Sequence, residues 1–468
     1  MRLILNAYDV IGLESYEKEQ LKELVDVLNS HVTSNAVKSK YYEGHIRLFD
    51  VNLGIALPKD FKLEIGCEWG AKAVDVLASR SMFDGFVGKN GEDTGVLKEI
   101  SERNRLISEY VKACKDELKY GCTFATLSAD EKIGCRIRFH SPLTASALWN
   151  GEKGRINCGL AIIDTVKDEA KAGTWQPSLI NLYTDTDIWE IHRIGTVWTA
   201  IRHPHIMGRP LFEPLVWNAT SSKPFGRSRI KEPVRRLIDG YVRTIANATI
   251  GLEFATSPQK YLLGISDEQF DKVVNQKFKQ YVGNILAATT NPETGNNPVF
   301  GQLTQGNIEP HVQMVRILAT QFSAITGLSV MDTGVINDAN PTSSDAILAQ
   351  SQTLILLAEQ LNNNNGDALR VIAHMAQAIA RNVSLEELNE NEINVMAHFK
   401  NPAMPSVAVT ADAAIKIASA RPEFAKTDAF MEMIGFSQAD IRRIKGQEER
   451  IRGQEILLEE FDNADIGE

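Results

Sequence analysis

The sequence predicts an α+β fold in which helices predominate, and three observations lead to that prediction. Apolar residues recur at helical spacing before residue 120 and again after residue 228. Between them, residues 120–220 hold short β-branched and aromatic runs separated by Gly, Asp and Asn. Apolar residues make up 43% of the chain and charged residues 24%, which excludes extensive disorder.

Three helices are expected in the first part of the chain. Residues 15–40 predict a helix that ends before Gly44, because four apolar residues repeat at helical spacing: Leu21, Leu24, Val25 and Leu28. Residues 68–85 predict a second amphipathic helix. Residues 101–119 predict a third, with Ser101 as its N-cap.

The next hundred residues predict a meander of antiparallel strands. Six runs have the required composition: 123–127, 133–139, 160–165, 178–184, 188–194 and 196–200. With the helices before them, they predict one α+β unit over residues 1–220.

A basic segment follows at 221–243, with seven Lys and Arg against two acids. Its second half predicts a helix, capped near Ser228 and continuing to Phe254. We expect either a solvated helix face or contact with an acidic partner, such as nucleic acid or a neighbouring subunit.

The remaining chain alternates helices with polar loops. We expect a strand at 260–263, a helix at 267–281, a Gly/Asn/Pro-rich loop or hairpin tip up to residue 307, and a helix at 309–326 that Gly327 ends. After a polar loop, a helix runs from 344 to 381, and Asn362–Asn365 with Gly366 predict a kink or break in it. A strand at 392–400 precedes a helical C-terminal part, which from 421 holds seven bases against twelve acids.

Composition excludes several classes of protein. The net charge of −10 argues against a protein that coats nucleic acid by bulk electrostatics. Five cysteines without a CxxC pair predict neither a disulfide framework nor structural zinc. We expect a soluble chain, because no signal-peptide pattern and no run near the roughly 18 apolar residues of a membrane span occurs.

The sequence holds no complete catalytic signature. No phosphate-binding GxxxxGK[ST] loop occurs, since residues 66–72 have the wrong spacing and no Ser or Thr after Lys72. His203 and His205 flank a proline, and Asp187 lies nearby in sequence; a surface turn and a strand-end turn are the favoured interpretations. Cys122 and Cys135 are expected to be buried. No cofactor and no metal are predicted.

Five short motifs occur in order along the chain. They are 41–44 (YYEG); 68–70 with 74–78 and 85–86 (EWG, VDVLA, GF); 225–239, which opens with FGRS; 340–347 (NPTSSDAI); and 393–399 with 401–402, 411–413 and Lys416. Together they resemble the portal proteins of tailed bacteriophages, of the type named for the SPP1 portal. The resemblance is diffuse but runs across most of the chain.

The resemblance implies a portal fold, assembled as a ring with a central channel. The corresponding parts would be a wing at 1–220, a first stem helix at 221–254, a clip at 255–308 and a second stem helix at 309–326. A tunnel loop would follow at 327–343, then a long kinked helix and returning wing strand at 344–409, and a helical crown at 410–468.

The family also implies function and partners. The ring, usually a homododecamer, lies at the unique capsid vertex of the virion and is made in the host bacterial cytoplasm. Double-stranded DNA passes through it during packaging and ejection. Implied partners are the terminase large subunit, which supplies the ATPase, the head–tail connector or adaptor, and the major capsid and scaffold proteins. No enzyme activity and no membrane are implied.

Three sets of site residues follow from this correspondence. Residues of the tunnel loop would face DNA in the channel: Met331, Asp332, Thr333, Asn337, Asp338 and Asn340. Residues of the basic stem segment would guide DNA or contact a neighbouring subunit: Lys223, Arg227, Arg229, Lys231, Arg235 and Arg236. Residues of the clip would dock the terminase or connector: Asn291, Glu293, Asn296, Asn297 and Phe300.

Two alternatives remain open. One is another structural head component, such as a minor capsid or scaffold protein, without a DNA channel. The other is an enzyme on an α+β fold with a site around His203, His205 and Asp187, although no complete catalytic constellation supports it.

Overall fold

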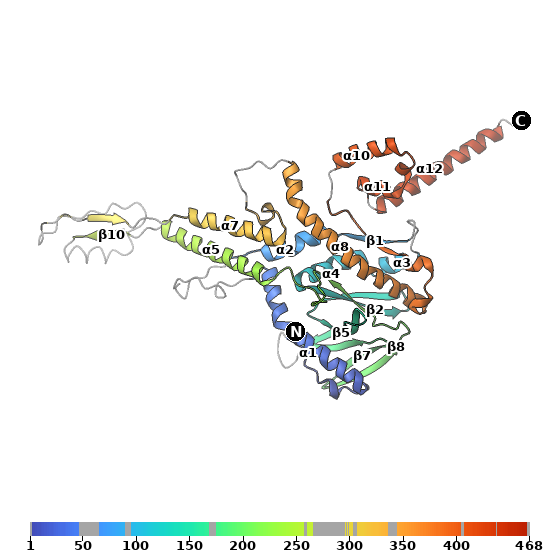
Figure 1. Ribbon diagram of the computed structural model, residues 1–468, viewed down its shortest axis with the longest axis horizontal. Coiled ribbons are helices and arrows are strands. Elements are labelled where there is room, and N and C mark those ends of the chain that lie inside the picture. Colours follow the sequence, from blue (N-terminus) through green and yellow to red (C-terminus); the bar gives the residue numbers. More distant parts are fainter. Residues whose placement is uncertain are drawn as a thin grey trace. The chain divides into compact units, whose positions relative to one another are not determined.

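The computed structural model describes residues 2–45, 65–88, 95–167, 175–256, 260–264, 295, 297, 299–302, 307–335, 344–403, 407–436 and 438–465. The chain divides into two compact units. Unit 1 comprises Met1–His45, Glu68–Arg235 and Ser323–Glu468, and unit 2 comprises Ile46–Cys67 and Arg236–Phe322. Figure 1 shows helices together with antiparallel sheets, which confirms the α+β prediction.

A five-stranded antiparallel meander forms one part of unit 1. Its strands, paired in chain order, are β4 (Ala145–Asn150), β5 (Arg155–Lys167), β6 (Trp175–Tyr183), β7 (Asp187–Ile194) and β8 (Val197–Pro204). Helix α1 (Ser15–Tyr42) packs on this sheet, and the predicted Leu21, Leu24 and Leu28 are buried against Leu160 and Ile180. Burial of this kind stabilises by about 25 cal/mol per Å² of apolar surface. A 3-10 turn, η1 (Ala7–Asp9), precedes α1.

A second sheet has three strands in the order β3-β2-β9. They are β2 (Cys122–Asp130), β3 (Gly134–His140) and β9 (Phe212–Val216), all antiparallel. The prediction of a single meander is therefore wrong, because β2 takes β9 as a partner from the far end of the region. Strands β4 and β9 were not predicted from the sequence.

The early helices differ in their bounds from the prediction. Helix α2 (Trp69–Ala78) ends well before residue 85, because the chain turns into strand β1 (Phe83–Val87). The expected third helix is two helices, α3 (Val96–Arg103) and α4 (Leu106–Tyr120), separated by Arg105 at φ 52°. Ser101 lies inside α3 and is not an N-cap, so that prediction is wrong.

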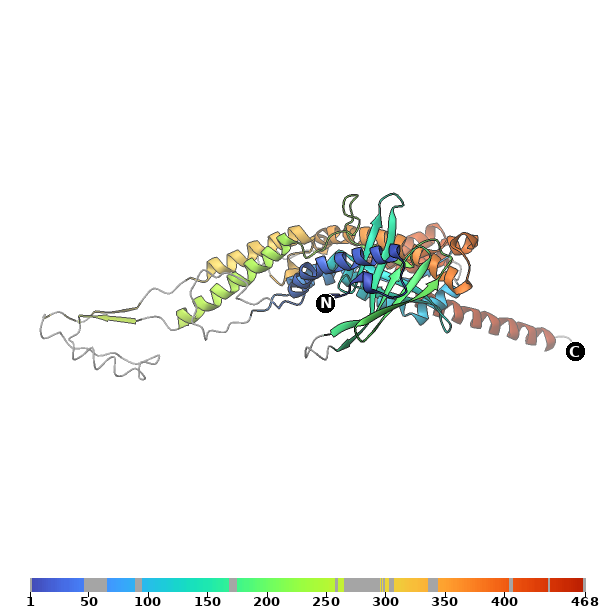
Figure 2. The same cartoon turned by 90° about the horizontal axis from the view of Figure 1, so that it is seen from below.

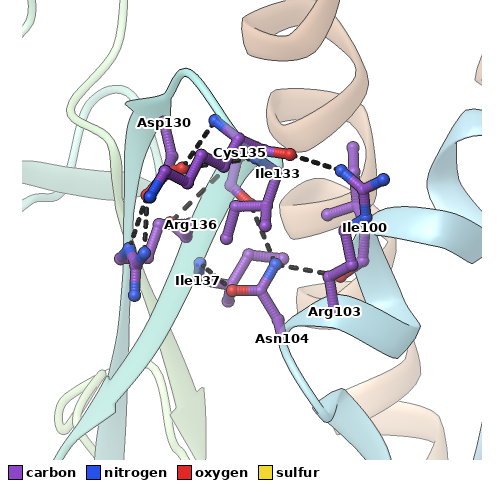
Figure 3. A network of polar contacts seen from close by, with 9 residues as sticks. Ile100, Arg103, Asn104, Asp130, Ile133, Cys135, Arg136 and Ile137 are labelled. Carbon is purple, nitrogen blue, oxygen red and sulfur yellow. Dashed lines mark hydrogen bonds and ion pairs between the residues drawn. The ribbon is translucent and has the colours of Figure 1, made fainter.

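The α3–α4 junction protects the free edge of β3 (Figure 3). The Asn104 side chain donates to the carbonyl of Cys135 at 2.8 Å and accepts from the amide of Ile137 at 2.9 Å. These are the two bonds that a neighbouring strand would make. Asp130 closes the β2–β3 turn by accepting from the amide of Lys132 and from the Arg136 guanidinium, whose Nη2 lies 2.6 Å away.

Helix α8 (Ser344–Arg381) runs without interruption through the four asparagines and Gly366. Of the two predicted alternatives, the break is therefore wrong, and the kink stays a prediction. Asn365 is fully buried, and its side-chain amide donates to the Tyr110 hydroxyl at 2.9 Å and to a Glu117 carboxyl oxygen at 2.7 Å. Since this side chain bonds across to α4, it does not compete for the backbone of its own helix. Asn382, at φ 54°, follows the last turn.

Two helices cross from one unit into the other. They are α5 (Glu232–Thr256) and α7 (Glu309–Thr326), and the second has the predicted bounds. Within unit 2 they lie side by side (Figures 1 and 2), and a Cβ added at Gly240 would meet Leu318 at 3.3 Å. Helix α5 begins four residues after Ser228, so Ser228 is not its N-cap. Strand β10 (Lys260–Leu263) is confirmed and pairs antiparallel with β11 (Val299–Gln302); the helix expected at 267–281 lies outside the described residues.

The C-terminal part is helical, as predicted. After the 3-10 turn η5 (Leu385–Glu387), α9 (Glu390–Ile393) leads into β12 (Met396–Phe399), which pairs antiparallel with β1. The strand predicted at 392–400 is thus shorter, and Ile393 belongs to a helix. Helices α10 (Val407–Ala420), α11 (Asp428–Ile434) and α12 (Gln438–Asp465) follow, with the turn η6 (Phe424–Lys426) between the first two.

Candidate functional site

The chain turns sharply after α7 and forms a compact knuckle at 327–334. Gly327, at φ 72°, ends the helix, and the Ser323 hydroxyl donates to the carbonyl of Leu328. The carboxylate of Asp332 then accepts from both the amide and the hydroxyl of Ser329, at 3.0 and 2.8 Å. This closes the 3-10 turn η4 (Met331–Thr333), which Gly334 ends at φ 80°. The first half of the proposed tunnel loop is therefore a folded turn.

The knuckle is attached to α2. The indole Nε1 of Trp69 donates to the carbonyl of Thr333 at 3.2 Å, and the Trp69 side chain is buried. Trp69 belongs to the motif EWG, one of the five motifs that carry the family resemblance. Its position shows that this aromatic side chain fixes the knuckle on the body of unit 1.

The predicted tunnel-loop residues have different environments. The side chain of Met331 is 59% exposed, so it is available to a partner. The carboxylate of Asp332 is engaged within the turn, and the hydroxyl of Thr333 donates to the carbonyl of Val330 at 2.5 Å. Asn337, Asp338 and Asn340 lie outside the described residues.

Arg229 is a buried cation at the base of the same region. Its Nε donates to the carbonyl of Ala73 on α2, and its Nη2 donates to the carbonyl of Thr326, each at 2.5 Å. Thr326 is the last residue of α7, where free carbonyls and the helix dipole favour a cation. The guanidinium also lies 5.7 Å from the Trp217 ring. Burial lowers the pKa of Arg229 to about 10, so the group remains charged at neutral pH.

The remaining basic residues are at or near the surface. Lys223, Arg227, Lys231 and Arg236 are exposed, whereas Arg235 is half-buried with its guanidinium 5.9 Å from the Tyr41 ring. Burial removes Arg229 from the set that an external polyanion can reach. Sequence reasoning could not make this distinction, because all six cations belong to one continuous segment.

The described clip residues lie on or near a small hairpin. Phe300 belongs to β11, and its side chain is 54% exposed. The neighbouring Val299 is 58% exposed, and Leu263 on β10 is 59% exposed. Asn297 is exposed, and Asn291, Glu293 and Asn296 lie outside the described residues. An isolated two-stranded sheet is marginally stable in water, so exposed apolar side chains on it favour contact with another chain.

Asp187 and His203 of the enzyme alternative are engaged by other side chains. Arg202 holds Asp187, with Nε and Nη2 at 2.7 and 3.1 Å from the two carboxylate oxygens. His203 lies 3.0 Å from Glu190 on the neighbouring strand. Within the part of the chain that the structure describes, no group of three His, Cys, Asp or Glu residues could hold a metal ion. Cys122 and Cys135 are buried, as predicted.

Across the described residues, none of the helices combines the length and the apolar character that a membrane crossing requires. Among curated proteins, no match was found. Among solved structures, similar chains come from a gene transfer agent virion and its neck. The native virion chain has 11% identity and a TM-score of 0.48, with 86% of this chain and 93% of that chain covered. A chain of the empty-particle neck, computed with C6 symmetry, has 12% identity and a TM-score of 0.45, with 81% of this chain and 89% of that chain covered. A chain of the native-particle neck, computed with C12 symmetry, has 11% identity and a TM-score of 0.44, with 79% of this chain and 89% of that chain covered.

The comparison with family models gives a match over most of the chain. Residues 21–453 match the family described as "Phage portal protein, SPP1 Gp6-like". The match includes α2 with Trp69, the buried Arg229, the knuckle and the whole of α8. The chain therefore belongs to the SPP1 Gp6-like family of phage portal proteins.

Proposed function

We propose that this portal protein assembles into a homo-oligomeric ring, a homododecamer, at the unique vertex of a bacteriophage capsid. Double-stranded DNA enters through its central channel, driven by the terminase, and later leaves through the same channel. The observation that carries the proposal is the family match over residues 21–453. The ring is assembled in the host bacterial cytoplasm and becomes part of the virion.

Exposed apolar side chains on α7 support assembly. Val312, Met314 and Ile317 are 40%, 44% and 52% exposed, whereas Leu318, Ala319 and Phe322 of the same helix are buried. Large apolar side chains gathered on one element are typical of protein–protein contacts. In a ring, the neighbouring subunit would cover them by a head-to-tail contact repeated around the axis.

The parts of the subunit are assigned by the same proposal. The wing is 1–220 together with the long helix and returning strand at 344–409, and the stem is α5 and α7. The clip is 255–308, where Phe300 and its exposed neighbours dock the terminase large subunit or the head–tail connector. The crown is 410–468. Capsid and scaffold proteins contact the outside of the ring.

The channel wall is proposed to include the knuckle and the tunnel loop that follows it. Met331 is the exposed apolar side chain of η4, and the net charge of −10 limits adhesion of DNA to the protein. Lys223, Arg227, Lys231 and Arg236 are the exposed cations that guide DNA or meet an acidic surface of the neighbour. The chain itself is proposed to be non-catalytic, with ATP hydrolysis by the separate terminase.

Electron microscopy of the purified protein tests this function. Rotationally averaged negative-stain images are expected to show rings with an open axial channel, and the rings are expected to have no ATPase activity. A protein that stays monomeric over a wide range of concentration and salt contradicts the proposal. Particles without an axial channel would indicate another structural head component.

A further inference from the structure

A buried polar network joins α4 to the middle of α8 inside unit 1. Glu117 of α4 and Asn365 of α8 both have no exposed surface. The amide Nδ2 of Asn365 donates to Oε2 of Glu117 at 2.7 Å and to the Tyr110 hydroxyl at 2.9 Å, which uses both amide hydrogens. The Tyr110 hydroxyl lies 2.7 Å from that of Ser81. The portal function proposed above assigns no role to this network.

Two oxygen atoms of the network have no hydrogen-bond partner among the described residues. They are Oε1 of Glu117 and Oδ1 of Asn365, and both are inaccessible to solvent. They belong to the same two side-chain ends that the bond from Nδ2 to Oε2 already joins. If Glu117 were ionised, both atoms would be buried acceptors without a donor, which is unfavourable. A single proton on Oε1 supplies the donor that both atoms lack.

The surroundings of Glu117 favour this proton. Burial raises the pKa of Glu117 to about 8, so the carboxyl is largely protonated at neutral pH. Lys38 of α1 and Lys115 of α4 act on neighbouring thiols, but no cation among the described residues offsets the burial of Glu117. Burial also raises the pKa values of the titratable groups that interact with Glu117, so they are neutral at neutral pH: Tyr110, Cys114 and Cys122.

We propose that Glu117 and Asn365 form a cyclic acid–amide pair, in which Nδ2–H donates to Oε2 and the carboxyl proton on Oε1 donates to Oδ1, and that this pair is a proton-dependent clamp between α4 and α8. The two bonds satisfy every polar atom of the two side-chain ends. Loss of the proton turns the second bond into a contact between two acceptors and leaves a buried negative charge without a cation. The clamp therefore holds α8 on α4 below about pH 8 and loosens above it.

The position of the clamp gives it a role in the proposed portal. Helix α8 follows the proposed tunnel loop in sequence, and Asn365 lies near the middle of its 38 residues. A clamp at this point limits the movement of α8 on the body of unit 1. This role rests on the proposed portal function, whereas the acid–amide pair does not, because both side chains belong to one chain.

Infrared spectroscopy of the full-length protein tests the proton. At pH 6 the difference between the native protein and Glu117→Gln should contain the C=O band of a protonated carboxylic acid, and this band should disappear between pH 7 and pH 9. Glu131→Gln, at an exposed carboxyl, is the control and should give no such band. In an Asn365→Leu background the band should lie at higher frequency, because the C=O has lost its amide donor. An absent band, or one whose frequency does not depend on Asn365, overturns the proposal.

Hydrogen exchange tests the clamp itself. Exchange of α8 amides around residue 365 is compared between the native protein and Glu117→Gln at the same pH, so that the intrinsic exchange chemistry cancels. For an opening that exposes Glu117, pKa values of 4.5 and about 8 predict that the ratio of the native rate to the variant rate rises about 100-fold between pH 6 and pH 9. A ratio that stays constant with pH overturns the clamp.

A reciprocal exchange of the two side chains separates an acid–amide pair from an acid that is merely buried. Glu117→Gln combined with Asn365→Asp places the acid on α8 and the amide on α4, so α8 should be protected at pH 6 as in the native protein. Glu117→Leu combined with Asn365→Asp keeps the buried acid without an amide, and exchange should be at least about tenfold faster. Equal exchange in the two double variants overturns the pair. Ring formation is recorded separately by electron microscopy, so a failure of the portal function is distinguishable from a failure of the clamp.

Discussion

Glu117 offers the sharpest test of the structure, through the substitution Glu117→Gln. This residue of α4 is fully buried, and one carboxyl oxygen accepts from Asn365 at 2.7 Å while the other has no partner among the described residues. Asn365 also donates to the Tyr110 hydroxyl, which lies 2.7 Å from the Ser81 hydroxyl. Burial raises the pKa of Glu117 to about 8, against 4.5 for an ordinary Glu, and no cation offsets this effect.

The sign of the effect follows from these two pKa values. Below about pH 4.5 both the folded and unfolded chains hold the proton, so ionisation contributes nothing to stability. Between about 4.5 and 8 the unfolded chain has lost the proton that the folded chain keeps, so stability falls as pH rises. Above about 8 both states are ionised and the loss is complete. The full difference is 8 − 4.5, or about 3.5 pH units, equivalent to about 5 kcal/mol.

Gln has nearly the same shape, accepts the same hydrogen bond and cannot ionise. Between pH 5 and pH 8 the free energy of unfolding of the native protein should therefore fall by about 3 kcal/mol relative to that of Glu117→Gln. Urea unfolding, followed by tryptophan fluorescence at fixed protein concentration, measures this difference. Glu131→Gln, on the exposed β2–β3 turn, is the control and should run parallel to the native protein. Parallel pH profiles for Glu117→Gln and the native protein would refute the account of Glu117 as a buried neutral acid.

Three further substitutions test other parts of the molecule. Gly70→Ala should prevent correct folding, because its Cβ would lie 2.0 Å from the carbonyl oxygen of Tyr41. Gly66→Ala is the control and should be tolerated, because no heavy atom lies within 4 Å of its added Cβ. Circular dichroism of the two variants measures the difference. Arg229→Met should cost about 2–3 kcal/mol in urea unfolding, since two buried carbonyls lose their charged donor, while Arg227→Met should change stability by less than about 0.5 kcal/mol. Ile317→Glu should leave the far-UV spectrum of the subunit unchanged but prevent ring formation, seen by electron microscopy; normal rings would remove α7 from the proposed interface.

The sequence predicted regular periodic elements well. Helices α1 and α7 and strand β10 have the expected bounds because their apolar spacing and their Gly or Asn boundaries agree. It failed where tertiary contacts override local preference. Four asparagines in succession predict a kink or a break, yet α8 continues without a break, because Asn365 finds its partners on α4, 248 residues away at Glu117. No local rule contains that information.

The candidate site was likewise predicted only in part, because long-range contacts decide which of its residues are buried. Order and spacing of motifs identified the family, but they could not separate buried from exposed members of the basic segment. Arg229 is distinguished only by the carbonyls of Ala73 and Thr326, which are 156 and 97 residues away. Trp69 was recognised as part of a motif, but its hydrogen bond to Thr333 spans 264 residues. Asn104, which protects the edge of β3, carried no signal at all.

Arg229 and Trp69 hold the two ends of the knuckle, at Thr326 and Thr333. Arg229 bonds the carbonyl of the last residue of α7, and Trp69 bonds the carbonyl at the end of η4, only seven residues later. The second anchor of Arg229 is Ala73, which lies on α2 one turn beyond Trp69. Helix α2 therefore fixes both ends of the knuckle through backbone carbonyls, which any residue supplies. Between these anchors Ser329 and Asp332 bond to each other and close the turn, whereas the side chain of Met331 is 59% exposed. The residue at position 331 can therefore change the chemistry of the loop surface while the base of the knuckle stays in place.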